Sequence, residues 1–233
     1  MYKNYIVEDI GTQSYADILD WDNFENLYIK AINQILDIQT FSVDNLENYS
    51  CDELYNEMEL MKKWYFESLL RKSLKPQQND VIKKTFDSIV ENISTQPQNI
   101  FVHKDFLSQN ISLNGDELLL KRPTNPKKGI LLYDLATILN DYHLNFERDD
   151  LIKLVLYFRD KKSLKVTDTE FIKWFDFISL QINMKLLGVF SHSFVCDGNK
   201  DVLKYIPIIL ETVFDLSNKY EETKQFTQLL KEL

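Results

Sequence analysis

Residues Asn99–Asn110 read Asn-Ile-Phe-Val-His-Lys-Asp-Phe-Leu-Ser-Gln-Asn. Three apolar residues lead into His103, which predicts a short strand that ends in a loop. Asp105 and Asn110 follow in that loop, five residues apart. This spacing fits a loop that leaves the strand, turns at Asp105 and returns with Asn110 facing the same point in space.

The spacing His-x-Asp-x-x-x-x-Asn is typical of the catalytic loop of kinase-type phosphotransferases. In this interpretation Asp105 accepts the proton of the attacking hydroxyl, and Asn110 offers its side-chain oxygen to the magnesium ion that bridges the ATP phosphates. His103 packs beneath the loop and holds it by hydrogen bonds. A motif this short also occurs by chance on unrelated loops, so the flanking sequence decides between the two interpretations.

Length and composition limit the alternatives. A chain of 233 residues with 44% hydrophobic content can form one globular domain, or a domain with a small appendage. The sequence has no apolar run of membrane-spanning length and no signal-peptide pattern at Met1–Asn4. Its two cysteines are far apart and its histidines do not cluster, so we expect no zinc site and a reduced, cytoplasmic location. The net charge of −9 argues against nucleic-acid binding.

The remaining patterns predict a mostly helical chain. Scarce glycine and proline favour few long loops, Ser50–Glu53 and Thr167–Glu170 are capping boxes, and Asn114–Gly115 predicts a hairpin. A strand at Tyr5–Val7 must find its neighbours later in the chain or in another molecule. Apolar periodicity predicts helices over 21–38, 50–69, 81–93, 133–142, 151–158, 167–187, 202–216 and 226–230, a hairpin over 111–120 and a loop over 122–129.

Further stretches stand in a fixed order around the central loop: Val7–Gly11, Glu57–Leu60 with Trp64–Tyr65, Tyr133–Ala136, and Gln181, Lys185, Leu186, Gly188, Asp197–Gly198 and Pro207. Together with the loop and the hairpin they resemble the C-terminal lobe of the aminoglycoside phosphotransferase superfamily. The nearest branch is that of the bacterial sugar kinases of cell-wall recycling, which phosphorylate N-acetylmuramate and N-acetylglucosamine at the anomeric hydroxyl. The resemblance covers nearly the whole chain.

The resemblance implies a mostly α fold, the helical C-terminal lobe of the protein-kinase-like fold with a small β-hairpin after the catalytic loop. It implies a residual hinge strand and turn at residues 1–11 and a helical lobe at 12–233, with the N-terminal lobe absent. Asp134 would support the catalytic loop from below. The expected ligands are Mg-ATP at the hinge residues Val7, Glu8, Asp9 and Ile10, and an amino sugar at Glu57, Gln181 and Lys185. A solvated helix glutamate is the commoner role for Glu57.

The sequence departs from the family in two places. The hinge begins at Val7, so the lobe that carries the phosphate-covering loop and the phosphate-pairing lysine would be missing. The family's magnesium-binding aspartate stands seven residues before a glycine, and counting back from Gly129 that position is Arg122. Arginine has no lone pair for a metal, and Asn110 alone would be a poor magnesium ligand. Arg122 could instead contact phosphate directly, or be a surface residue left after the constraint disappeared.

Three functions follow as hypotheses. The first is a degenerate phosphotransferase that still binds a sugar or a partner. The second is an active sugar kinase, completed by a second chain, in which Asp105 is the base. The third is an interaction module without a ligand. A strand at Tyr5–Val7 without its sheet would leave an unpaired edge, so we expect a homodimer or a partner resembling the N-terminal lobe at this hinge edge.

Overall fold

The computed structural model describes residues 3–11, 13–142 and 147–233. The chain divides into two compact units, and each is described by itself. The first unit comprises Met1–Tyr49 and Pro97–Phe175, and the second comprises Ser50–Gln96 and Asp176–Leu233. The expected division into a hinge segment at 1–11 and a helical lobe at 12–233 stays a prediction.

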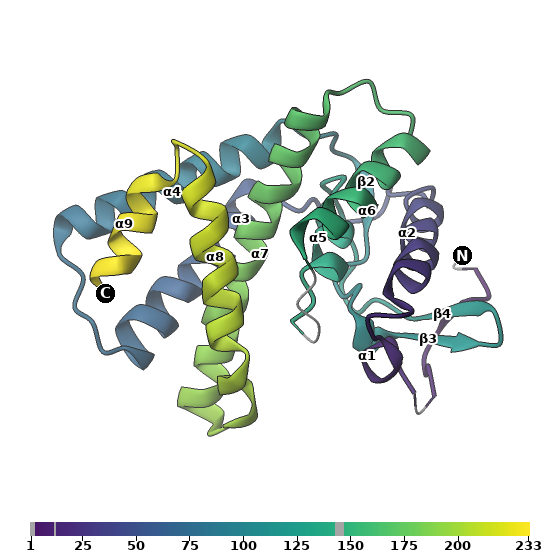
Figure 1. The fold of residues 1–233 in the computed structure, drawn as a ribbon, viewed down its shortest axis with the longest axis horizontal. Helices are drawn as coiled ribbons and strands as arrows, with labels where there is room; N and C mark the ends of the chain where they lie inside the picture. Colours follow the sequence, from purple (N-terminus) through teal and green to yellow (C-terminus); the bar gives the residue numbers. More distant parts are fainter. Residues whose placement is uncertain (1–2, 12, 143–146) are drawn as a thin grey trace. The chain divides into compact units, whose positions relative to one another are not determined.

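A three-stranded sheet organises the first unit (Figure 1). Strands β3 (Ile111–Asn114) and β4 (Glu117–Lys121) form the predicted hairpin, which turns at Gly115 with φ of 61°. Strand β1 (Ile6–Val7) lies parallel to β4, so the partner of the N-terminal strand comes from later in the same chain. Helices α1 (Tyr15–Ile18) and α2 (Phe24–Ile38) contact this hairpin.

A second, two-stranded sheet holds the central loop. Strand β2 (Ile100–Val102) is the predicted apolar run before His103, and it pairs antiparallel with β5 (Lys127–Gly129). The prediction of a continuous loop over 122–129 is therefore wrong at its end. The sequence of β5 has no apolar pattern that would predict a strand, because a lysine takes one of its buried positions. The Lys127 side chain is only 6% exposed, and its ammonium reaches Glu47 at 2.7 Å.

Helices complete the first unit. Helix α5 (Tyr133–Leu139) is buried along its whole length, and α6 (Arg148–Lys161) packs against α2. The short 3₁₀ helix η2 (Ser108–Asn110) lies directly before β3 and contacts α1. Long helix α7 (Asp168–Asp197) begins in this unit and continues into the second. The buried α5 is the element that supports the central loop.

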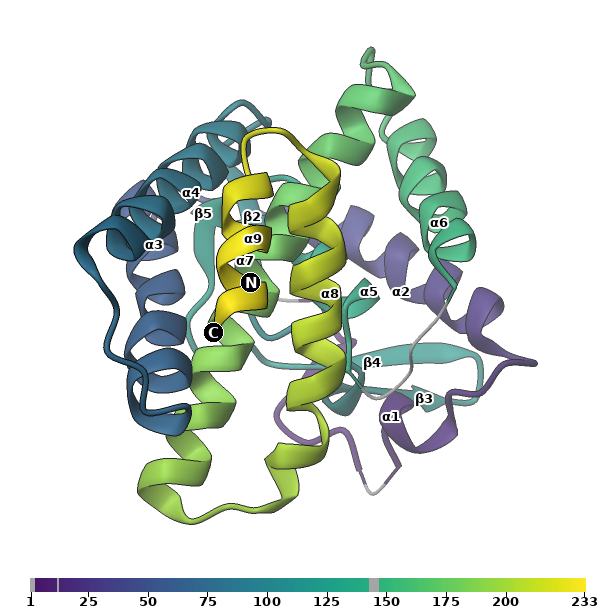
Figure 2. The same cartoon turned by 60° about the vertical axis from the view of Figure 1, so that its left-hand side comes forward.

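The second unit is helical (Figure 2). The Ser50–Glu53 capping box begins α3 (Cys51–Leu60), and Pro76 stands at the start of α4 (Pro76–Ser94). Helix α8 (Ile206–Lys219) accommodates Pro207 in its first turn after the short helix η3 (Asp201–Lys204). Helix α9 (Lys224–Glu232) packs against both α8 and α4. None of the helices in the described ranges combines the length and the apolar content that a membrane crossing needs.

The second unit also contains a π-helix that the periodicity did not predict. Helix α3 ends at Leu60, and the segment Met61–Leu69 (η1) continues it with π geometry. Gly188 of α7 lies against the junction, where an added Cβ would stand 2.4 Å from the Leu60 carbonyl carbon and 2.6 Å from the Met61 nitrogen. Only a glycine permits so close a backbone approach. A π-helix often marks a functional region.

Candidate functional site

The central loop is anchored to α5 through Asp134. One carboxylate oxygen accepts the His103 amide at 2.7 Å, and the other accepts the Lys104 amide at 3.0 Å. Lys104 has φ of 70°, a left-handed conformation that is unfavourable for a side chain of this type. Burial raises the pKa of Asp134 to about 7, against the effect of the two amide donors. Asp134 thus determines the path of the backbone on both sides of the His103–Lys104 bond.

His103 holds the loop to the end of the hairpin. Its ring is fully buried, and Nε2 lies 2.8 Å from the Lys121 carbonyl oxygen. Because a carbonyl only accepts, Nε2 carries the proton and Nδ1 is an acceptor, for which no described residue is a hydrogen-bond partner. Burial lowers the pKa of His103 to about 4. A neutral imidazole joins the loop to β4 near Arg122.

Asp105 and Asn110 meet within this loop. The Asn110 side-chain amide donates to the Asp105 backbone carbonyl at 2.9 Å, which closes the turn predicted from their spacing. The half-buried Asp105 carboxylate accepts a hydrogen bond from the Thr124 hydroxyl at 2.9 Å. A carboxylate that already accepts from a hydroxyl is oriented as a proton acceptor for a hydroxyl group.

Asp141 is a second loop anchor that the sequence analysis missed. This buried carboxylate, two residues beyond the end of α5, accepts the amide of buried Ser108 at 2.9 Å. Together with Asp134 it holds both sides of the segment that carries Asp105. The only signal in the sequence was a carboxylate at the end of an apolar helix, which is far more often a solvent-exposed cap.

The hinge residues adjoin β4, but two of their carbonyls are taken within the chain. The Val7 carbonyl accepts the Arg122 amide at 2.7 Å, and the Ile10 carbonyl accepts the Ser112 hydroxyl at 2.8 Å. A cavity of about 560 Å³ opens beside them, within the size range of small-molecule sites. The described residues that line it include three carboxylates and one cation, and they are Glu8, Asp9, Ile10, Gly11, Ser14, Asp17, Gln109 and Lys121.

The residues at the expected magnesium position do not fit a divalent cation. Arg122 directly follows β4, and its guanidinium forms an ion pair with Glu8 at 2.8 Å. A fixed positive charge repels Mg²⁺, and the neighbouring carboxylate Asp105 is engaged by Thr124. Across the described ranges, no group of three or more His, Cys, Asp or Glu side chains is placed to hold a metal ion. Asn110 remains as a lone amide ligand.

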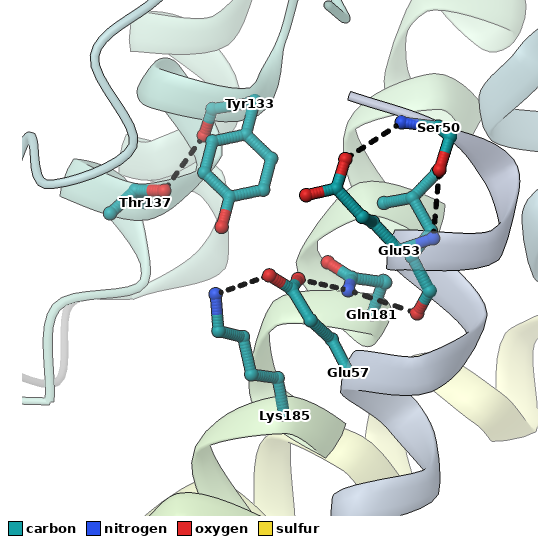
Figure 3. A network of polar contacts seen from close by, with 8 residues as sticks. Ser50, Glu53, Glu57, Tyr133, Thr137, Gln181 and Lys185 are labelled. Atoms are coloured by element: carbon teal, nitrogen blue, oxygen red, sulfur yellow. Dashed lines mark hydrogen bonds and ion pairs between the residues drawn. The ribbon is translucent and has the colours of Figure 1, made fainter. Parts of the chain in front are cut away.

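The expected substrate residues lie together in the second unit. Figure 3 shows the Glu57 carboxylate between Lys185 and Gln181, with Oε1 at 2.9 Å from the Lys185 ammonium and Oε2 at 3.0 Å from Gln181 Nε2. Gln181 is fully buried, and no described residue is a hydrogen-bond partner for its Oε1. The three side chains come from α3 and α7, which Gly188 brings into contact one turn further along. Glu57 is therefore part of a polar network and is not a solvated helix glutamate.

The structure thus places the sequence-predicted residues in two groups. The first unit brings together His103, Asp105, Asn110, Arg122 and Asp134 around the central loop, beside the hinge residues Val7, Glu8, Asp9 and Ile10. The second unit brings together Glu57, Gln181 and Lys185. The roles in catalysis and binding expected for these residues stay predictions.

Known proteins resemble this chain over most of its length. No family model matches it. It is 24% identical over 238 residues to an N-acetylmuramate/N-acetylglucosamine kinase of Neisseria meningitidis, in a match that covers 98% of this chain and 71% of that relative. Among solved structures, a choline/ethanolamine kinase family protein from Mesorhizobium loti aligns with a TM-score of 0.64 at 11% identity, covering 96% of this chain and 70% of that one.

A second solved structure with the same fold contains a nucleotide. The GDP complex of aminoglycoside 2'-phosphotransferase-IIIa aligns with a TM-score of 0.57 at 13% identity, covering 91% of this chain and 70% of that one. Identities this low show the fold alone, and the nucleotide is a property of that protein. The chain has the aminoglycoside-phosphotransferase-like kinase fold and is distantly similar, over 98% of its length, to N-acetylmuramate/N-acetylglucosamine kinases.

Proposed function

We propose that this chain is a sugar-binding protein related to amino-sugar kinases whose capacity for phosphoryl transfer is impaired. The observation that carries the proposal is Arg122, which stands where the family resemblance implies a metal-binding aspartate and is ion-paired with Glu8. Phosphoryl transfer depends on positioning and on neutralising phosphate charge with metal ions. A site that replaces the metal carboxylate by a guanidinium loses much of that stabilisation.

The second unit supports the sugar-binding half of the proposal. A sugar offers several hydroxyls and, in an acetylated amino sugar, an amide. The buried Gln181 Oε1 is an acceptor for such a donor, and the Glu57–Lys185 pair combines an acceptor with a donor. The relatives' names point to N-acetylmuramate and N-acetylglucosamine as the sugars to test first.

The nucleotide half is tested by calorimetry with ATP and magnesium. The unchanged chain is expected to show no magnesium-dependent binding, whereas Arg122→Asp, which restores a carboxylate after β4, is expected to gain it. Arg122→Gln is the matched control, because it removes the positive charge without adding a ligand. Magnesium-dependent ATP binding by the unchanged chain that Asn110→Ala abolishes would contradict the proposed impairment.

The sugar half is tested by thermal unfolding with each amino sugar. A ligand at 100 times its Kd stabilises the folded state by about 2.7 kcal/mol, so binding raises the melting temperature measurably. Gln181→Met and Lys185→Met are expected to reduce that shift, and Lys63→Met on the π-helix serves as the control. Absence of a shift with either sugar at millimolar concentration argues for an interaction module without a ligand.

An active kinase is the second candidate, and the intact loop favours it. Hydrogen bonds of Asp134, His103 and Asn110 hold the loop that carries Asp105 in a defined conformation. In that case Asp105 accepts the proton of a sugar hydroxyl. Turnover of an amino sugar with ATP by the unchanged chain, lost in Asp105→Asn, would establish this candidate in place of the first.

The hinge edge remains the proposed surface for a homodimer or a partner resembling the N-terminal lobe. Strand β1 pairs with β4 on one side and is the outer strand of its sheet. Sedimentation at micromolar concentration tests self-association, and a monomer that is insensitive to changes at Val7 counts against a homodimer there.

A further inference from the structure

Thr124 makes a side-chain contact with the central loop. Its hydroxyl donates to Asp105 Oδ2 at 2.9 Å, an ordinary hydrogen-bond length, across 19 residues of sequence. Both residues belong to the first unit, Asp105 in the central loop and Thr124 in the connection between β4 and β5. In the second candidate function Asp105 accepts the proton of a sugar hydroxyl, and in this structure Asp105 accepts a hydrogen bond from a hydroxyl of its own chain.

The connection that carries Thr124 is constrained along its length. It reads Arg122-Pro123-Thr124-Asn125-Pro126 and lies between strands that are each paired, β4 with β3 and β5 with β2. Each proline fixes its own φ and restricts the residue before it to extended conformations. The Arg122 amide is held by the Val7 carbonyl at 2.7 Å. The branched Thr124 side chain has few rotamers of its own. The backbone on both sides of the exposed Thr124 is thus restricted, which limits the directions in which its hydroxyl can point.

We infer that the Thr124 hydroxyl occupies the position on Asp105 that a substrate hydroxyl would take, so that a sugar must displace it in order to bind. The inference rests on the second candidate function, in which Asp105 accepts the proton of a sugar hydroxyl. It requires no covalent step, because one hydroxyl donor replaces another on the same carboxylate oxygen. Thr124 is then a determinant of affinity that weakens binding of any ligand whose hydroxyl needs Asp105.

Titration of the whole chain with N-acetylglucosamine and N-acetylmuramate by calorimetry tests this inference. Thr124→Val keeps the shape of the side chain and removes its hydroxyl, so it is expected to bind the sugar about three- to tenfold more tightly. Thr124→Ser, which restores a hydroxyl, is expected to return the affinity toward that of the unchanged chain. Thr40→Val, whose hydroxyl bonds to the Asp37 carbonyl in the same unit, is the matched control for loss of a threonine hydroxyl.

The sign of the effect separates this role from a structural one. A threonine that merely stabilised the loop would, when replaced by valine, weaken binding or leave it unchanged, and either result overturns the inference. A gain in Thr124→Val that persists in the Asp105→Ala background also overturns it, because there is then no carboxylate to release. If neither the unchanged chain nor Thr124→Val binds either sugar, the proposed function is overturned as well. If the two chains bind the sugars equally, this inference alone is overturned.

Discussion

The loop anchor Asp134 gives the sharpest prediction for stability. Its two carboxylate oxygens accept the amides of His103 and Lys104 in a fully buried position. Asp134→Asn keeps the size of the side chain but replaces one acceptor oxygen by an NH₂ group, which then faces a backbone N–H. Asp134→Ala removes both acceptors. Each change removes at least one of the two Asp134 oxygens that accept these amides.

The expected cost follows from the number of amides affected. A buried donor left without a partner costs about 1–3 kcal/mol. We expect Asp134→Asn to lower the free energy of unfolding by about 2–4 kcal/mol and Asp134→Ala by about 3–5 kcal/mol, since the second change affects both amides. Losses of this size are a large part of the total stability of a typical protein of about 5–15 kcal/mol.

Urea denaturation at pH 5 measures these losses, because burial raises the pKa of Asp134 to about 7 and the stability that this side chain contributes is lost as the pH rises through that value. Asp116→Asn is the control, because its side chain is fully exposed opposite Lys30, and it is expected to change stability by less than about 0.5 kcal/mol. Amide hydrogen exchange supplies a local readout, in which His103 and Lys104 lose protection in Asp134→Ala. If the two amides keep their protection, or if Asp134→Asn costs no more than the control, the assignment of Asp134 as the loop anchor is refuted.

Three further predictions concern single residues. His103 has a pKa of about 4 in the folded chain, below its value of 6.5 when unfolded, so its contribution to stability is complete above pH 6.5 and is lost as the pH falls toward 4. His103→Asn should remove a slope worth about 3 kcal/mol over that window, measured by urea unfolding across pH, and equal slopes in both chains would contradict the assignment. Gly188→Ala should lower the free energy of unfolding by about 1–3 kcal/mol through overpacking against Leu60 and Met61, even after the gain in helix propensity of about 1 kcal/mol. The control Val189→Ala, at the exposed neighbouring position, should lower it by less than about 0.5 kcal/mol. Gln181→Glu places a second carboxylate beside Glu57 and should lower the free energy of unfolding by about 3 kcal/mol more than Gln181→Met does, as measured by urea denaturation. Equal free energies in the two variants would show that the network is open to solvent.

The features that the sequence predicted correctly are those set by neighbouring residues. The Ser50–Glu53 cap, the Asn114–Gly115 hairpin turn and Pro207 in the first turn of α8 each depend on a few consecutive residues. The closing contact between Asp105 and Asn110 belongs to the same class, because it spans a single loop. Local chemistry was therefore enough to place the central loop and most of the helices.

The features that the sequence did not predict depend on residues far apart in the chain. The β5 strand reads as a charged loop until β2 and Glu47 are placed around Lys127. The π-helix after Leu60 shows an ordinary helical apolar pattern, and its junction is identified only by the approach of Gly188. Asp141 reads as a solvent-exposed cap until its partner Ser108 is placed beside it. In each case the deciding partner is at least 25 residues away, beyond the reach of any periodicity.

The connection between β4 and β5 carries both residues on which the two proposals depend. Arg122 is ion-paired with Glu8, and two residues later the Thr124 hydroxyl donates to the Asp105 carboxylate. The sequence pointed to Arg122, because it differs in residue type from what the family resemblance implies at that position. It could not point to Thr124, since only the distance between its hydroxyl and Asp105 makes it a candidate competitor. Both lie on a segment whose two prolines restrict its conformations, so we propose that one short connection determines both the charge and the accessibility of the candidate site.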